Sequence, residues 1–268
     1  MKRILSLAMA LVILFSFTVS ASASGFYSEY IDSIYENLSE SNDSCNGAPQ
    51  QVVNGSYRTF EMLYIIALEF DEDGLYTSYI SDIYDDYKDY NDNCSGAPQQ
   101  IVNGTYRSVE MLTIIALELD ENGDYTDIIS GIIDDFSTIN DSCSGAPQQQ
   151  ANGAYRMCEL LAVIACELDT DGILNSVIVG VLDDLTENDD NCSGAPQQLA
   201  NGAYRMVDLL YIISVEVDED NIYGEITETV YESLSTQNAK CESAVQQSVN
   251  GFYRSVELLY IIADLLDT

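Results

Sequence analysis

The sequence has no histidine and no tryptophan, and it has little positive charge: nine Lys and Arg residues stand against 45 Asp and Glu residues. Without histidine, Ser-His and Cys-His catalytic pairs and histidine-bound metal sites are excluded. The formal net charge of −36 argues against nucleic acids and anionic membranes as partners, because both are polyanions. It favours solubility, cation binding or life in high salt. Hydrophobic residues make up 47% of the chain and are regularly spaced, so the chain is expected to fold.

The first 23 residues have the features of a secretory signal peptide. Lys2 and Arg3 precede an apolar stretch from Ile4 to Val19, and Ala21-Ser22-Ala23 offers the small residues that signal peptidase recognises. The alternative is a retained membrane anchor. The sequence therefore predicts a signal peptide over residues 1–23 and a secreted mature chain over residues 24–268. This chain would be released outside the cell or held at the cell surface by non-covalent contacts.

A 49-residue repeat fills the predicted mature chain. Its clearest mark is one cysteine per unit, at Cys45, Cys94, Cys143, Cys192 and Cys241, followed by a Gly-Ala-Pro-Gln-Gln segment in four units and an Asn-Gly pair in all five. Five units of this length span residues 24–72, 73–121, 122–170, 171–219 and 220–268, which agrees with cleavage after Ala23. A fixed period of this size is the mark of a repeat array.

Each unit is predicted to contain two helices. The first has apolar residues at helical spacing, as in Tyr76, Ile80 and Tyr87. The second starts near the Ser-Gly-Ala-Pro segment, where proline suits a first helical turn, and runs to about Leu119 in the second unit. The Asn-Gly pair either bends this helix or lets a neighbour pack closely. Since one helix pair cannot bury both its apolar faces, we expect an all-α fold, an α-solenoid of five 49-residue helical hairpins.

A polar stripe recurs along every second helix. At 100° per residue its four members fall within about 80° of each other. We take them as candidate ligand-binding residues: Gln51, Asn54, Arg58, Glu61, Gln100, Asn103, Arg107, Glu110, Gln149, Asn152, Arg156, Glu159, Gln198, Asn201, Arg205, Asp208, Gln247, Asn250, Arg254 and Glu257.

The arginines of the stripe are the only arginines in residues 24–268, so their position demands a guanidinium. One interpretation is structural: each arginine pairs with the acidic residue one turn later and with loop carbonyls of the adjacent unit. The other is functional: five parallel stripes line a groove for an extended, repetitive ligand. The tyrosine before each arginine, such as Tyr106, is expected in the core rather than in that groove.

The five repeated cysteines have several interpretations. Disulfides between neighbouring units fit poorly, because packed helices lie about 10 Å apart and bridged Cα atoms within about 7 Å. The thiols are then small residues that close the loop, partners in disulfides between chains, ligands of a soft metal, or part of a Cys–Gln thioester. A place at a helix N-terminus is expected to lower their pKa. Cys158 and Cys166, which only the third unit has, are expected in the core.

The turns between units are acidic. Glu69-x-Asp71-x-Asp73-Gly74 imitates the start of a calcium loop, but the twelfth position, which should be glutamate, is Ile80. These turns are predicted to be capped and solvated, without a dedicated cofactor, and with at most weak binding of divalent cations.

The sequence as a whole points to a non-enzymatic extracellular protein, since an enzyme gathers unlike residues into one site whereas this chain repeats the same residues five times. The first hypothesis is a binding or surface-scaffold module whose partner is an extracellular protein or polymer. The second is a self-assembling filament or matrix protein that partners itself, because the last helix ends in the apolar run Leu258 to Ala263 without a polar cap. The third is a thiol-based metal-binding or redox protein.

Overall fold

The computed structural model describes residues 25–71, 73–94 and 96–267, and these residues form ten helices. The prediction of an all-α protein is confirmed. Long helices of 23 residues alternate with shorter ones. The long helices are α3 (Ala48–Phe70), α5 (Ala97–Leu119), α7 (Ala146–Leu168), α9 (Ala195–Val217) and α11 (Ala244–Leu266). The shorter ones are α2 (Ser28–Ser44), α4 (Thr77–Asn93), α6 (Thr126–Ser142), α8 (Asn175–Asn191) and α10 (Gly224–Asn238).

The helix boundaries follow from local chemistry. Four long helices carry proline in their first turn, where the missing N–H has no intrahelical role. The turn after the first three of them contains a glycine in the left-handed region, with φ of 72–74° at Gly74, Gly123 and Gly172. Asn221, with φ 53°, takes that place after α9. None of the described helices is apolar and long enough to cross a bilayer.

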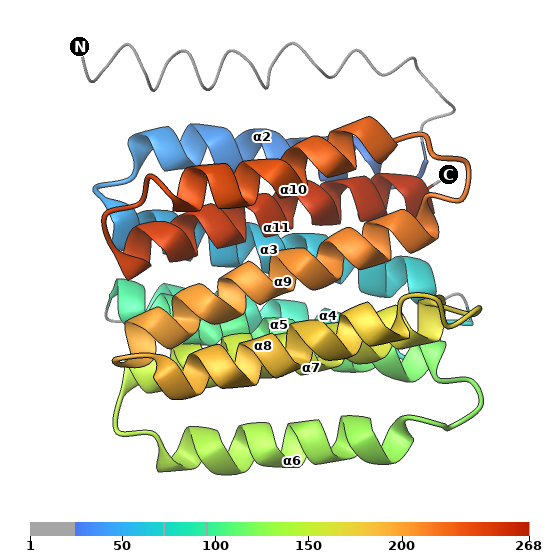
Figure 1. The fold of residues 1–268 in the computed structure, drawn as a ribbon, viewed down its shortest axis with the longest axis horizontal. Helices are drawn as coiled ribbons and strands as arrows, with labels where there is room; N and C mark the ends of the chain where they lie inside the picture. Colours follow the sequence, from blue (N-terminus) through green and yellow to red (C-terminus); the bar gives the residue numbers. More distant parts are fainter. Residues whose placement is uncertain (1–24, 72, 95, 268) are drawn as a thin grey trace.

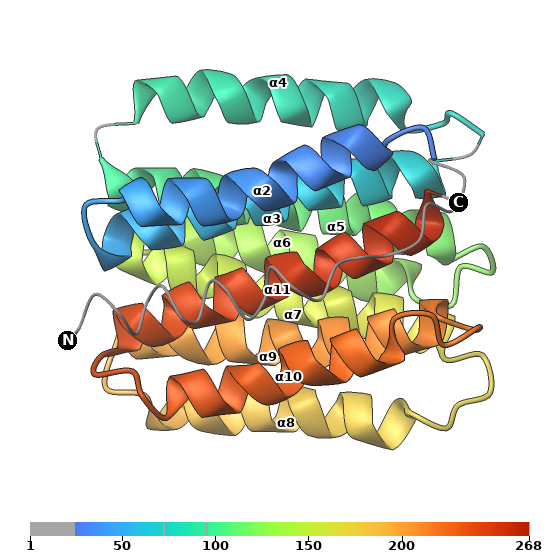
Figure 2. The ribbon, with the colours of Figure 1, turned by 90° about the horizontal axis from the view of Figure 1, so that it is seen from above.

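The ten helices form two concentric layers, with the long helices inside and the shorter ones outside (Figures 1 and 2). Each long helix packs against the next along the chain, and α11 packs against α3, so the inner layer closes into a ring. The expected solenoid is an open row, and the structure differs from it in this closure. The inner helices all begin at one end of the ring, here called the loop end, which contains Cys45. They finish at the other, here called the turn end, which contains Asp71.

The closing contact repeats contacts found within the chain. In four turns an aspartate accepts a hydrogen bond from the backbone N–H five residues later, as Asp120 does from Tyr125 at 3.0 Å. At the closure, Asp267 accepts from the N–H of Tyr27 at 2.8 Å, and Ser28 Oγ donates to Asp267 Oδ2 at 2.9 Å. The last inner helix is thus joined to the first outer helix as in any other turn.

Aromatic pairs show the same equivalence. Tyr64 and Tyr84 stack at 4.4 Å between the first and second units, and Tyr211 and Tyr231 do so at 4.4 Å between the fourth and fifth. Tyr260 and Tyr35 meet at 4.9 Å across the closure. Of the apolar residues at the end of α11, Leu258, Leu259, Ile261, Ile262 and Ala263 are buried, and Tyr260 is half-buried against α2.

The axis of the ring is filled by side chains. One leucine from each inner helix forms a layer: Leu63, Leu112, Leu161, Leu210 and Leu259. The gap between them is about 10 Å³, which is room for one water molecule at most. The ring is therefore a packed barrel rather than a pore.

Candidate functional site

The asparagines of the polar stripe join the two helices of each unit. Asn54 Nδ2 donates to the backbone carbonyl of Leu38 on α2 at 2.9 Å. The same bond, to the carbonyl 16 residues earlier, is made by Asn103, Asn152, Asn201 and Asn250. A buried amide without hydrogen-bond partners is costly. Separating the two helices would leave the asparagine amide without this partner, so the repeated hydrogen bond holds each inner helix to its own outer helix.

The arginines pair with the acidic residue three positions later in all five units. Arg107 Nη1, for example, lies 2.6 Å from Glu110, and Arg205 Nη1 lies 2.8 Å from Asp208. The pairing of each arginine with the acidic residue one turn later, which the structural interpretation expected, is therefore found in the molecule. In place of the expected loop carbonyls of the adjacent unit, the arginines of the second, third and fourth units meet a carboxylate on the unit's own outer helix, such as Asp184 at 3.3 Å from Arg205. The arginines lie in mid-helix, where the neighbouring outer helix is nearer than any loop.

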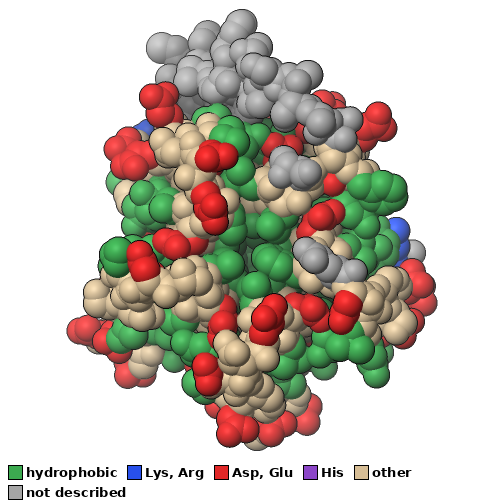
Figure 3. Space-filling model, turned by 90° about the vertical axis from the view of Figure 1, so that its right-hand side faces the viewer, with side chains coloured by type: hydrophobic (Ala, Val, Ile, Leu, Met, Phe, Trp, Pro, Cys, Tyr) green, Lys and Arg blue, Asp and Glu red, His purple; other side chains and the backbone are tan. Residues whose placement is uncertain are grey.

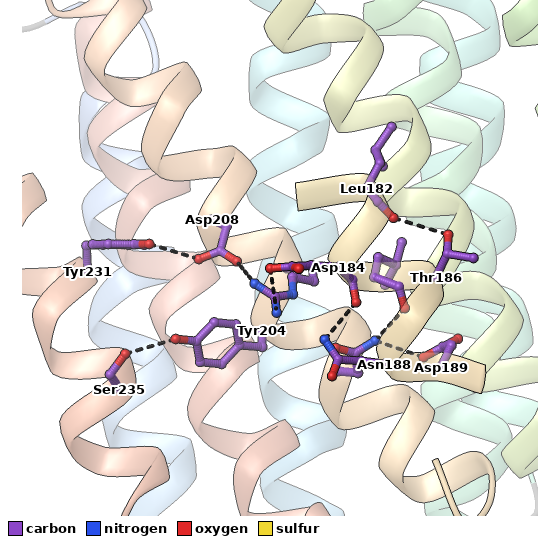
Figure 4. A network of polar contacts seen from close by, with 12 residues as sticks. Leu182, Asp184, Thr186, Asn188, Asp189, Tyr204, Asp208, Tyr231 and Ser235 are labelled. Carbon is purple, nitrogen blue, oxygen red and sulfur yellow. Dashed lines mark hydrogen bonds and ion pairs between the residues drawn. The ribbon is translucent and has the colours of Figure 1, made fainter. Parts of the chain in front are cut away.

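The next unit along the ring completes the network. Tyr231 on α10 donates to Asp208 at 3.1 Å, and Ser235 on the same helix contacts the hydroxyl of Tyr204 at 2.9 Å (Figure 4). Each guanidinium also lies over the ring of the tyrosine that precedes it, at 4.7–5.2 Å. The stripe therefore lies beneath the outer helices. Its glutamines, such as Gln51, which donates to the carbonyl of Asn42 at 3.3 Å, are half-buried near the loop end.

The arginine–carboxylate pairs are not equally covered. The acidic side chains of Glu61, Asp208 and Glu257 are 7, 6 and 5% exposed, whereas those of Glu110 and Glu159 are 32 and 25% exposed. The next outer helix supplies a tyrosine (Tyr84, Tyr231 and Tyr35) beside the first three pairs, and Ile133 or Leu182 at the same position beside the other two. The five stripes are therefore not equally accessible to a ligand.

Burial, the first cause in each case, raises the pKa of Glu61, Glu110, Glu159, Asp208 and Glu257, although arginine opposes the shift. A carboxyl group whose pKa is higher in the folded than in the unfolded state adds to the stability of the fold at low pH. The full contribution is present at pH values below the pKa of the unfolded state, about 4.3 for glutamate. It is lost as the pH rises through the pKa of the folded state.

We therefore expect the free energy of unfolding to be higher at about pH 5 than at about pH 7.5, measured by urea unfolding. Near pH 4 the free energy of unfolding stops increasing. A hydrogen bond from Thr126 lowers the pKa of Asp120, and the stability that this group contributes is lost as the pH falls. Repeating the series at about 1 M salt screens repulsion between surface carboxylates, so a difference that persists there comes from the buried groups. Equal stability at both pH values would contradict the prediction.

The repeated cysteines end the outer helices. Cys45, Cys94, Cys143 and Cys192 follow the last residues of α2, α4, α6 and α8. Burial raises the pKa of all five repeated thiols, so the expected lowering by a helix N-terminus is wrong. Each thiol belongs to the C-terminal end of the preceding helix, and a glycine separates most of them from the next helix. All seven cysteines are free thiols in the chain.

Among the described residues, no cysteine belongs to a cluster of three metal-ligating groups. The thiols lie in different units around the loop end, and the structure does not bring them together as a metal site. Cys158 is buried and its thiol donates to the carbonyl of Gly202 at 3.3 Å, as expected of a core residue. Cys166 packs half-buried against the core.

The turn end contains features that the repeat motif did not single out. The residue after the turn glycine, or after Asn221, is a large apolar side chain exposed to solvent: Leu75 is 65%, Ile173 72% and Ile222 64% exposed. Phe26 has the same place in the first unit and Asp124 in the third. Apolar residues at the start of an outer helix, outside its buried face, were the available signal. Such residues mark interaction surfaces when they gather on one face.

Carboxylates surround these apolar side chains. The carboxylate oxygens of Asp71, Asp73 and Glu118 lie within 4.8 Å of one another. Burial and then the neighbouring aspartates raise the pKa of Glu118, Glu167 and Glu216, one in each of three successive units. Glu118 of the next unit thus lies beside the calcium-like turn, whose own twelfth position has no carboxylate. Weak cation binding here stays a prediction.

A hollow of about 340 Å³ opens at the loop end between the first two units. Its lining is mostly uncharged and polar, and includes Ser41, Gln50, Asn91 and Tyr57. The other units have Tyr90, Ile139, Asn188 or Gln237 at the position of Ser41. Serine is the smallest of the five side chains and leaves the most room at this position.

Comparison of the chain with protein families, with characterised proteins and with solved structures finds no match.

Proposed function

We propose that the chain is a secreted, non-enzymatic protein of five helical repeats that acts as an extracellular binding or surface-scaffold module, with the turn end of its ring as the interaction surface. One observation carries this proposal. The polar residues that recur in every unit are engaged in joining helices, as Asn54, Arg205 and Asp208 show, while four of the large apolar residues most exposed to solvent, Phe26, Leu75, Ile173 and Ile222, lie at the turn end. The polar residues of the repeat hold the ring together, and the ring exposes the turn end to solvent.

The same contacts weigh against the two other hypotheses. A filament built by continued stacking of repeats needs a free helix face at the end of the row, and the apolar face of α11 is covered by α3. A thiol-based site needs converging or acidic thiols, whereas the repeated thiols are apart and burial raises their pKa.

The proposal predicts that the mature chain is a monomer that neither polymerises nor needs metal. Sedimentation and electron microscopy across salt and calcium titrations are expected to show single compact particles. Mass spectrometry after alkylation of the unfolded protein is expected to count seven modified thiols. Filaments or regular arrays would overturn the proposal in favour of self-assembly, and a metal retained through purification would overturn it in favour of a thiol-based site.

A further inference from the structure

We infer that the turn end binds a cationic amphipathic segment of a peptide or protein, one that presents apolar side chains flanked by lysine or arginine. This inference rests on the proposed function, since it names the partner of the surface assigned there. It is carried by the combination of an apolar centre and an acidic surround on the same face.

The centre of the face is the exposed end of the axial core. Leu63 and Phe70 lie seven residues apart on α3, so both face the axis, and Phe70 is the last residue of that helix. The equivalent residues of the other inner helices, Leu119, Leu168, Val217 and Leu266, are also half-buried and pack on the core. Figure 3 shows hydrophobic side chains through the middle of this face. The inner layer therefore ends in an apolar floor.

Exposed apolar residues extend this floor outward. Leu75, Ile173 and Ile222 each lie two residues before the first residue of α4, α8 and α10, and each has more than half of its surface in contact with water. Covering such side chains is favourable by about 25 cal/mol for each Å² of apolar surface removed from water. An apolar partner thus gains from contact with the floor and with these residues together.

The surround of the face is negatively charged. Asp73, Glu118, Glu167, Asp171 and Glu216 all belong to the turns or to the last turn of an inner helix. In Figure 3 acidic side chains are distributed around and among the hydrophobic ones, and basic side chains are seen only at the margin. Of the described basic residues, the arginines lie in mid-helix and Lys88 and Lys240 lie toward the loop end.

This charge selects among the possible occupants. A second copy placed turn end to turn end brings like charges together, and an anionic lipid or nucleic acid does the same. A cationic segment relieves the crowding of carboxylates that helps to raise the pKa of Glu118, Glu167 and Glu216. An amphipathic segment can also cover the apolar floor with its own apolar side chains, whereas a simple polycation cannot.

Binding can be followed by the tryptophan fluorescence of a peptide, because the protein itself has no tryptophan. The probe is a synthetic peptide of about 18 residues, about five helical turns, with leucine on one face, lysine on the other and a single tryptophan. Its fluorescence is followed while the chain from Ser24 to Thr268 is added. A shift of the emission to shorter wavelength, with saturation and with weakening at high salt, is the expected result.

Two control peptides test the two halves of the inference. One keeps the leucine face and replaces lysine with glutamate, and the other keeps lysine and replaces leucine with serine. Both are expected to bind at least about tenfold more weakly, a difference of about 1.4 kcal/mol. Equal binding of the lysine–serine peptide would overturn the apolar contact, and equal binding of the leucine–glutamate peptide would overturn the role of charge.

Two matched variants locate the site. Leu75→Ser, Ile173→Ser and Ile222→Ser together are expected to weaken binding at least about tenfold. The control is Tyr90→Ser and Ile139→Ser, which removes exposed apolar side chains from the loop end of the outer helices. Thermal unfolding checks that both variants fold. Equal effects of the two variants, or no effect of the first, would overturn the assignment to the turn end.

A third variant tests the carboxylates without changing apolar surface. Glu118→Gln, Glu167→Gln and Glu216→Gln are expected to weaken binding and to flatten its salt dependence, and an unchanged salt dependence would overturn their role. A monomeric ring to which no cationic peptide binds would overturn this inference alone. Filaments in the absence of peptide would instead overturn the proposed function.

Discussion

Replacing Arg254 with alanine is expected to lower the free energy of unfolding by about 3–5 kcal/mol, because it leaves a buried carboxylate unpaired. Glu257 is only 5% exposed, and besides pairing with Arg254 it accepts a hydrogen bond from the hydroxyl of Tyr35 at 3.5 Å. Urea unfolding at neutral pH measures the loss. The loss is expected to shrink as the pH falls, because protonation of Glu257 removes the unpaired charge.

The second unit offers a matched control. Arg107→Ala breaks the same pair, but the side chain of Glu110 is 32% exposed and keeps its contact with water. This change is expected to cost about 1 kcal/mol. The double variant Arg254→Met, Glu257→Leu is expected to regain most of the stability lost in Arg254→Ala. Equal losses at Arg254 and Arg107 would contradict the difference in burial on which the prediction depends.

Replacing Gly251 with alanine is expected to destabilise the protein by about 1–3 kcal/mol, although alanine is the better helix former. A Cβ at Gly251 would lie 2.7 Å from the Cβ of Ala203 and 2.9 Å from its backbone carbonyl. The backbones of α11 and α9 would have to move apart. Chemical denaturation is the measurement, with a lower midpoint and an unchanged slope expected.

Two other glycines serve as the control for that experiment. Gly131 on α6 and Gly180 on α8 are exposed, and a Cβ at either would meet nothing within 4 Å. Gly131→Ala and Gly180→Ala are each expected to stabilise the protein by about 0.5–1 kcal/mol through helix propensity. A stabilising effect of Gly251→Ala as well would show that the inner helices do not need the close approach.

Much of the local structure was predictable because it depends on neighbours in the sequence. The second helix of the second unit was expected to run from the Ser-Gly-Ala-Pro segment to about Leu119, and α5 spans Ala97–Leu119. The pairing of Arg107 with Glu110, three residues apart on one helix, follows from the same local geometry. The Asn-Gly pair left two interpretations open, and the uninterrupted inner helices with their close contacts decide for close packing.

The closure of the ring was not predictable from the repeat pattern. It depends on the small rotation between neighbouring inner helices, which side chains such as Ala203 and Ser56 set where they meet a glycine. The pattern of apolar positions in the sequence does not determine this rotation angle. One sign was present: Tyr35 and Tyr260, in the first and last units, are the same residue types as at interior interfaces, whereas the ends of an open array are expected to be polar.

The candidate site was predictable only in its composition. The stripe of Asn, Arg and Glu was recognised, but its burial depends on which residue the next outer helix places above it, such as Tyr231 beside Asp208. The expected thiol reactivity was wrong for a related reason, since Cys45 belongs to the helix before it and its surroundings raise its pKa. The turn end was missed because its apolar residues stand outside the recurring motif.

The joining of Asp267 to Tyr27 and Ser28 has a consequence for how the protein unfolds. In an open array the two end repeats have a single neighbour each, so they fray first and the array melts inward. Here every repeat has two neighbours, and releasing any one of them breaks two interfaces at once. Partly unfolded states therefore lose about twice the contact energy that they would lose at the end of a row. The ring is expected to behave as one cooperative unit, without the low-energy local openings from which most repeat arrays begin to melt.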